Sequence, residues 1–183
     1  MVYQVNSNYS GGTLPGIELR RGSRLDLVVS NTLMRLAGVV PVVGSVQGVG
    51  AFFRSSLQLT NRSPFAVDGT MTYHPAGTPA SSSDPTLTYH LNPSGSAFYS
   101  DIAAAFGRTG TGSLDVFTSS IAPEVTAYVY NDVGAAGTYG FTEDLVPPES
   151  MFDQEATFGR IPVVSDLTNF RVNIGVRTLN TPT

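Results

Sequence analysis

One alternating strand pattern is written twice in this chain. Phe53–Asn61 and Phe170–Arg177 both begin with Phe-Arg and then place an apolar residue at almost every second position. Ser55 is the polar exception in the first copy, and each copy follows a Pro-Val-Val run, at 41–43 and at 162–164. A period of two sends alternate side chains to opposite faces of a strand, so one face packs on a core while the other meets water. The repeat therefore predicts two equivalent amphipathic strands in an antiparallel fold.

Short apolar runs bounded by turn-forming residues predict further strands along the chain. The expected strands cover 25–29, 38–43, 65–67 with 70–74, 86–91, 112–117, 124–130, 138–142 and 158–164, besides the two Phe-Arg copies, of which the second is expected to extend to 178. We expect a loop over 44–50 and a β-bulge at Asp68-Gly69. The fold class that follows is an all-β, antiparallel, immunoglobulin-like sandwich.

One short helix is expected at about 100–107. Ser100 is a good N-cap, Asp101 suits the positive end of a helix, and Gly107 can end it in the left-handed conformation. A single helical turn is expected around 32–36, and another short helix is expected to start at 147–150.

The length of 183 residues suits one domain with a sizeable core. We expect residues 1–37 to form an N-terminal arm or extra strands, and 38–183 to form the sandwich with a truncated second repeat from about 158. An exposed sheet edge is a template for strand addition. The second Phe-Arg strand is therefore expected either to complete its own sandwich or to dock into a neighbouring copy. Its residues are Phe170, Arg171, Val172, Asn173, Ile174 and Val176.

Charge is scarce in this sequence and is scattered. Only 13% of the residues are charged, the net charge is -4, and all ten basic residues are arginine. Without a basic run, the chain does not look like a nucleic-acid binder. The most apolar stretch, 25–43, is interrupted by Asp26, Asn31, Arg35 and Pro41, so a membrane-spanning helix is not expected. The absence of cysteine removes disulfides and thiolate chemistry from consideration.

Several short motifs occur in a fixed order along most of the chain. They are Val-Pro-Val, Phe-Arg-x-x-Leu-x-Leu-x-Asn, Tyr-x-Pro-x-Gly, Asp-Ile-Ala-Ala-Ala-Phe-Gly, Gly-Ser-Leu-Asp-Val, Tyr-Asn-Asp and Phe-Arg-x-Asn-Ile-Gly, at 40–42, 53–61, 73–77, 101–107, 112–116, 130–132 and 170–175. This order resembles a group of bacterial secreted β-sandwich repeat proteins that are rich in Ser, Thr and Gly. The resemblance covers roughly residues 38–180 and implies export and a structural role, with no defined activity. Residues 1–12 lack the layout of a signal peptide, so either a signal is removed before this numbering begins or export is not used.

The residues able to carry chemistry form no catalytic motif. His74 and His90 are the only histidines. If His74 pairs opposite Thr86 in a hairpin, the two rings share a face without meeting, and each is expected to be structural or exposed. No Gly-x-Ser-x-Gly elbow occurs, and Gly107–Gly112 lacks the Lys-Ser/Thr of a phosphate-binding loop. We therefore expect no enzyme and no cofactor.

Two surface groups are weaker binding candidates. Glu143, Asp144 and Asp153, with Glu149 and Glu155 nearby, are hard oxygen ligands that suit Ca²⁺, although their spacing matches no calcium loop. Tyrosines on the predicted strands can stack sugar rings if several lie on one exposed face; these are Tyr73, Tyr89, Tyr128 and Tyr130, with Tyr139 beyond them.

The function expected from these patterns is that of a non-catalytic structural or adhesive module at the cell surface or in the extracellular space. A first alternative is a subunit of an extracellular filament or coat assembled by strand donation. A second alternative is a carbohydrate-binding module.

Overall fold

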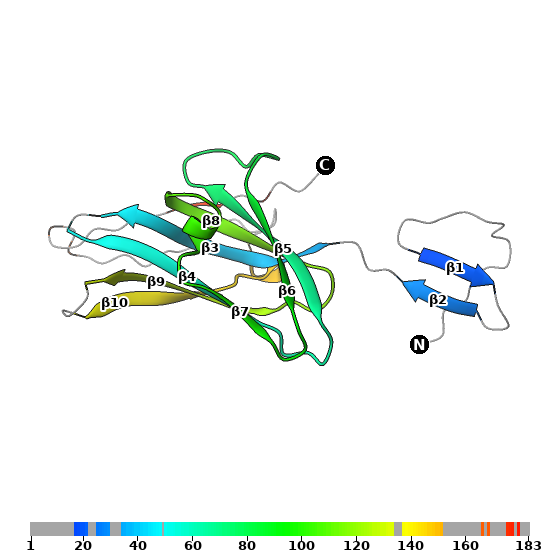
Figure 1. Cartoon of the computed structure of the whole chain (residues 1–183). Coiled ribbons are helices and arrows are strands. Elements are labelled where there is room, and N and C mark those ends of the chain that lie inside the picture. The colour runs from blue at the N-terminus through cyan, green and yellow to red at the C-terminus, as the bar shows by residue number, and fades with distance from the viewer. Residues whose placement is uncertain are drawn as a thin grey trace.

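The structure, a computed structural model, describes residues 17–21, 25–29, 34–48, 50–133, 137–151, 166, 168, 175–177 and 179. The described strands pair antiparallel. β1 (Ile17–Arg21) and β2 (Leu25–Val29) form a two-stranded sheet of their own, and eight further strands form the main sheet. The expected all-β, sandwich-like class is confirmed (Figure 1).

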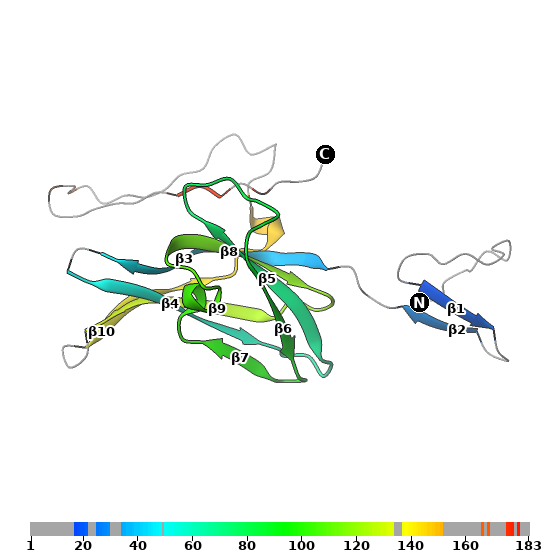
Figure 2. The same ribbon diagram turned by 45° about the horizontal axis from the view of Figure 1, so that its top comes forward.

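The main sheet is folded into two layers that lie face to face (Figures 1 and 2). One layer has the order β10-β9-β4-β7, and the other has the order β3-β8-β5-β6. The strands are β3 (Arg35–Gln47), β4 (Phe52–Thr60), β5 (Val67–Pro75), β6 (Thr86–Leu91), β7 (Ser96–Tyr99), β8 (Gly110–Thr118), β9 (Glu124–Asp132) and β10 (Thr138–Asp144).

The layers separate because β4 changes its neighbour along its length. At its start, residues 52–54 pair with residues 45–47 of β3. At its end, residues 57–60 pair with β7, while β3 continues along β8. One side of β4 is thus shared between two strands that belong to different layers. The β3–β4 hairpin is the hinge from which the two layers diverge.

The core lies between the layers and is built from the inward positions of nearly every strand. Its members, with the residues of the short helix that closes it, are Ala37, Val40, Val43, Leu57, Leu59, Val67, Met71, Tyr73, Tyr89, Leu91, Ile102, Ala103, Phe106, Leu114, Val116, Val125 and Ala127. Removal of apolar surface from water is the main force that favours this arrangement.

β4 confirms the first of the two repeated strands. Leu57 and Leu59 are both 0% exposed, as the alternating pattern predicts. The polar exception, Ser55, is also buried, and its Oγ accepts a hydrogen bond of 2.8 Å from the backbone N–H of Gly44. A serine at this inward position therefore pairs a donor that β3 turns towards the interior.

β3 is longer than the sequence predicts, and the expected loop over 44–50 is largely wrong. The strand continues to Gln47 because residues 43–45 still pair with β8, and Ser45 also pairs with Arg54 of β4. The helical turn expected around 32–36 is wrong for Arg35 and Leu36, which begin this strand. Bulges interrupt β3 before Gly38 and between Val40 and Val43, where Pro41 lies.

The β5–β6 hairpin forms as predicted, but its register is two residues from the expected one. Thr86 pairs with Thr72, not with His74, and His90 pairs with Asp68. A shift of two residues leaves every side chain on the same face, so alternation alone cannot distinguish the two registers. The bulge expected at Asp68-Gly69 is wrong, since β5 keeps unbroken register with both neighbours.

The expected helix is present as α1 (Ile102–Ala105), and it packs against β3 and β4 where these strands part. Its N-cap is Asp101, not Ser100: Asp101 Oδ1 accepts from the N–H of Ala104 at 3.0 Å. Gly107 ends the helix with a φ of 67°, and the N–H groups of Gly107 and Arg108 bond back to Ala104 and Ala103. The short helix expected from 147 is a single 3-10 turn, η2 (Pro148–Ser150).

We predict that Asp101→Ala lowers the free energy of unfolding by about 1–2 kcal/mol, because an N-cap and a partly buried hydrogen bond are lost together. The second bond is 2.8 Å long and is donated by Ser45 Oγ to Asp101 Oδ2. Urea denaturation measures the change. Ser100→Ala is the matched control and is expected to stay within about 0.5 kcal/mol of wild type. An equal loss in both variants would contradict the assignment of the cap.

The second repeated strand lies mostly outside the described residues. This applies to Phe170–Ile174 and to the predicted strand 158–164. Gly175, Val176 and Arg177 are described and are not in a strand, and Val176 is 86% exposed, so this end of the predicted strand is wrong. Arg177 is instead held by an ion pair with Asp115.

Candidate functional site

His74 is the centre of a cluster of ionisable side chains in the described part of the chain. It lies near the end of β5, beside β8. Its Nδ1 is 2.6 Å from Asp84 Oδ2, and its Nε2 is 3.0 Å from Asp115 Oδ2. Arg177 Nη2 donates to the same Asp115 oxygen at 3.0 Å. We call these four residues the His74 cluster.

The fold brings these residues together from four separate places. His74 and Asp115 lie on neighbouring strands of the outer face, Asp84 ends the loop between β5 and β6, and Arg177 comes from near the C-terminus. The side chains of His74 and both aspartates are about nine-tenths buried. The cluster therefore cross-links a loop, two strands and a distant segment in a place that water reaches poorly.

Asp84 stays ionised because its partners outweigh its burial. Burial by itself raises the pKa of Asp84. Hydrogen bonds from the Ser81 N–H and from His74, together with the charges of His74 and Arg108, lower the pKa by more than burial raises it. The net pKa of Asp84 therefore lies below its ordinary value. The loop carboxylate is thus a charged acceptor over the neutral pH range, and it faces the imidazole ring directly.

Chemically, this arrangement is suited to holding parts of the chain together. A general base needs a ring nitrogen that can reach a substrate or a nucleophile. Here each ring nitrogen is already engaged by a carboxylate. Among the described residues, no group of three His, Asp or Glu side chains is arranged to hold a metal ion. The His74 ring lies between the two carboxylates, with one carboxylate at each ring nitrogen.

Sequence reasoning missed this cluster. Asp84 is ten residues from His74 and Asp115 is 41 residues away, so no motif spacing links them. The only local signal is that His74 and the Asp84-Pro85 pair bracket one hairpin loop. The partnership with Asp115 depends on strand order, which periodicity does not provide.

The second histidine forms a simpler pair on the same sheet. His90 Nδ1 lies 2.7 Å from Asp68 Oδ1, and both side chains are more than half exposed. The hydrogen bond and charge of Asp68 raise the pKa of His90 above its ordinary value. Register explains the pair, because His90 and Asp68 are opposite each other in the ladder.

We predict that the His90–Asp68 pair stabilises the fold only at lower pH. A raised pKa in the folded state means that the stabilisation is complete below the ordinary histidine pKa of about 6.5 and is lost as pH rises through the folded value. NMR titration of the His90 ring measures that value. Asp68→Asn is expected to move it back towards the ordinary one, and an unchanged titration would contradict the pairing.

The predicted tyrosine row is only partly on the surface. Tyr73 and Tyr89 are buried in the core, so they cannot offer ring faces to a sugar, and this part of the hypothesis is wrong. Burial raises the pKa of Tyr89 to about 12, and its hydroxyl donates to the Phe117 carbonyl at 2.7 Å. Tyr128 and Tyr130 are half-buried on the outer face of β9. Their rings stack at 5.4 Å with an angle of 11° between planes.

The acidic residues near β10, which are weak calcium candidates, form no group of three suited to a metal ion among the described residues. Glu143 Oε2 accepts from the backbone N–H of Val42 at 3.0 Å, and burial raises the pKa of Glu143, partly opposed by that bond. Asp144 is the next residue along the strand and so points to the other face. Asp153 and Glu155 lie outside the described residues.

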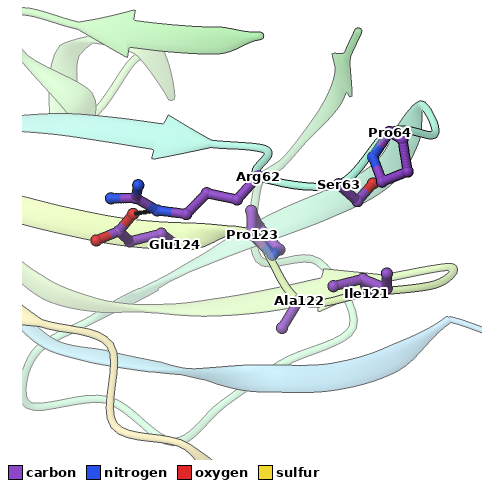
Figure 3. A pocket seen from close by; sticks show the side chains of 7 residues that line it. All are labelled: Arg62, Ser63, Pro64, Ile121, Ala122, Pro123 and Glu124. Atoms are coloured by element: carbon purple, nitrogen blue, oxygen red, sulfur yellow. Dashed lines mark hydrogen bonds and ion pairs between the residues drawn. The ribbon is translucent and has the colours of Figure 1, made fainter. Parts of the chain in front are cut away.

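A shallow hollow of about 480 Å³ lies at the end of the sandwich where β9 begins (Figure 3). Its lining is mainly apolar and comes from two loops: Arg62, Ser63 and Pro64 on one side, and Ile121, Ala122, Pro123 and Glu124 on the other. Figure 3 shows Arg62 paired with Glu124 at one end of the hollow. Both charges are exposed, so the pair contributes little to stability. The hollow suits an apolar contact more than a reaction.

In the described part of the chain, no helix is both long and apolar enough to cross a membrane. No protein-family model matches the chain, and comparisons with curated proteins and with solved structures give no match either. The resemblance to secreted β-sandwich repeats therefore stays a prediction.

Proposed function

We propose that this protein is a non-catalytic structural or adhesive module that works at the cell surface or in the extracellular space. The observation that carries the proposal is the His74 cluster. Its imidazole, carboxylate and guanidinium groups are hydrogen-bonded within the cluster. Together they join a loop, two strands and Arg177, which comes from near the C-terminus. A sequence with few charges, and many exposed Ser and Thr side chains in the described part of the chain, suit contact with other uncharged surfaces.

Self-association is the form of this function that the edge of the sheet favours. β10 is the last strand of its layer, and on its inward side Tyr139 and Phe141 remain 56% and 54% exposed. At the other end of β9, Ile121 is exposed beside the hollow. Exposed apolar groups at both ends of one layer suit a head-to-tail contact, which gives open filaments when the rotation between copies does not close.

Light scattering and negative-stain imaging of the purified chain over a range of concentrations test this proposal. We expect concentration-dependent assembly that is weakened in Tyr139→Ser/Phe141→Ser. Thr142→Ser lies on the opposite face of the same strand and is the matched control. A chain that stays monomeric at every concentration, and is absent from the medium and surface of fractionated source cells, would contradict the proposal.

A deletion separates two ways in which the second Phe-Arg segment can contribute. If residues 169–183 complete their own sandwich, the truncated chain should lose folding as a monomer. If they are donated to a neighbour, the truncated chain should fold and no longer assemble.

Carbohydrate binding is a second candidate, which the Tyr128–Tyr130 stack favours. The two parallel rings lie beside Arg54 and Ser56 in the register of β4, so apolar ring faces and polar groups share one sheet face. A glycan array tests it, with Tyr128→Ala expected to abolish binding and Thr126→Ala expected to preserve it. A blank array for the wild-type chain would remove this candidate.

A further inference from the structure

The His74 cluster contains one more acceptor than a neutral imidazole can serve. Both of its ring nitrogens lie within hydrogen-bond distance of a carboxylate oxygen, at 2.6 Å to Asp84 and 3.0 Å to Asp115. An ionised carboxylate can only accept, and a neutral imidazole has one N–H and one lone pair. Both contacts are hydrogen bonds only when the ring carries both protons.

The charges around the ring come from every element that packs against it. Asp84 faces it from the β5–β6 loop and Asp115 from β8, where Ser113 is the residue directly opposite His74. Arg177 reaches the cluster through Asp115, and the charge of Arg108, beyond α1, acts on Asp84. With a doubly protonated ring, the two carboxylates face three cations, which are the ring, Arg177 and Arg108. With a neutral ring they face only the two arginines.

Loss of a single proton would therefore place a ring lone pair against a carboxylate at close range. That contact is repulsive, and the groups are too buried for water to screen it well. Asp84 keeps the Ser81 N–H as a donor, and Asp115 keeps Arg177. Each carboxylate thus keeps a donor without the ring, and the donor of Asp84 lies in its own loop, so the ring contact is the one free to open.

We propose that the His74 cluster is a proton-dependent clasp: the doubly protonated ring links the β5–β6 loop to β8, and release of one proton opens the link. The loop in question is the Ser- and Pro-rich segment 76–85, whose tip is exposed. The same residues would hold it against the sheet in acidic surroundings and let it move away in alkaline ones. Such a clasp can operate whether or not the protein assembles or adheres.

The first test compares the folding equilibrium of wild type with that of His74→Gln, by urea denaturation of the full chain at about pH 5.5 and about pH 8.5, either side of histidine titration. We expect the ratio of the two equilibrium constants to fall roughly tenfold between these conditions, in line with the loss of one charged hydrogen bond. The titration of His90 is present in both proteins and cancels. His90→Gln is the matched control, and it leaves the clasp intact.

A second measurement does not depend on the variant folding. In the wild-type chain, ¹⁵N shifts of the His74 ring report its protons, and ¹³Cγ shifts of Asp84 and Asp115 report the two contacts. We expect two ring N–H groups at the lower pH, one at the higher pH, and a matching change at one carboxylate. A pH-independent stability ratio would overturn the clasp, and so would a ring that loses its proton while both carboxylate signals stay unchanged.

Discussion

Gly69→Ala is expected to lower the free energy of unfolding by about 3 kcal/mol, an unusually large effect for one added methyl group. A Cβ at position 69 would lie 2.1 Å from the Tyr89 ring and 2.2 Å from the Phe117 carbonyl oxygen. These are the two partners of the 2.7 Å hydrogen bond that crosses over this glycine. Overpacking typically costs about 1–3 kcal/mol, and breaking a buried hydrogen bond adds to that cost. Urea denaturation measures the loss.

Gly175→Ala is the matched control for this substitution, since nothing lies within 4 Å of a Cβ built there. It should change stability by no more than about 0.5 kcal/mol. A Gly69→Ala protein as stable as this control would mean that Tyr89 does not lie across β5 as described. The buried hydroxyl gives a second readout, because an exposed Tyr89 would titrate near the ordinary value of about 10.

Leu57→Ala is expected to lower the free energy of unfolding by about 2–5 kcal/mol, because it leaves a cavity at the centre of β4. Leu57 is fully buried and belongs to the core between the two layers. For a domain of this size, such a loss lowers the melting temperature by roughly 2–4 °C per kcal/mol. Gln58→Ala, on the exposed face of the same strand, is expected to leave both quantities nearly unchanged. Equal effects of the two substitutions would contradict the facing of β4.

Alternation predicted the strands well where one face meets the core and the other meets water. β4, β8 and β9 lie where their patterns indicate, whereas β5 begins at Val67, so Phe65 and Ala66, which were expected in a strand, precede it. The bounds of β3 were harder to predict, because its outer side is also partly covered. Val39 is buried, and its backbone N–H and carbonyl both form hydrogen bonds with the backbone of Val146. A strand buried on both faces gives no alternation, so its continuation through Gly44 to Gln47 resembled a glycine-rich loop.

The hydrogen-bond partners of polar residues at inward positions could not be predicted from the sequence. Ser55 binds a backbone donor of β3, and Asn61, at the end of the same pattern, donates to the carbonyls of Phe65, Leu91 and Asn92. Apart from Phe65, the backbone groups that these two side chains bind are 11 or more residues away along the chain. The same reason hid the His74 cluster, whose contacts depend on the order and register of β5 and β8.

The fold and both candidate sites depend on the arrangement of two layers around β4, and methyl NOE spectroscopy of the full chain tests that arrangement. We expect NOEs that connect the methyl groups of Leu57 and Leu59 with those of Val40, Met71, Leu114 and Val116, which belong to the opposite layer and to the same core. NOEs from the two leucines that reach only β9 and β7, with none to the opposite layer, would contradict it.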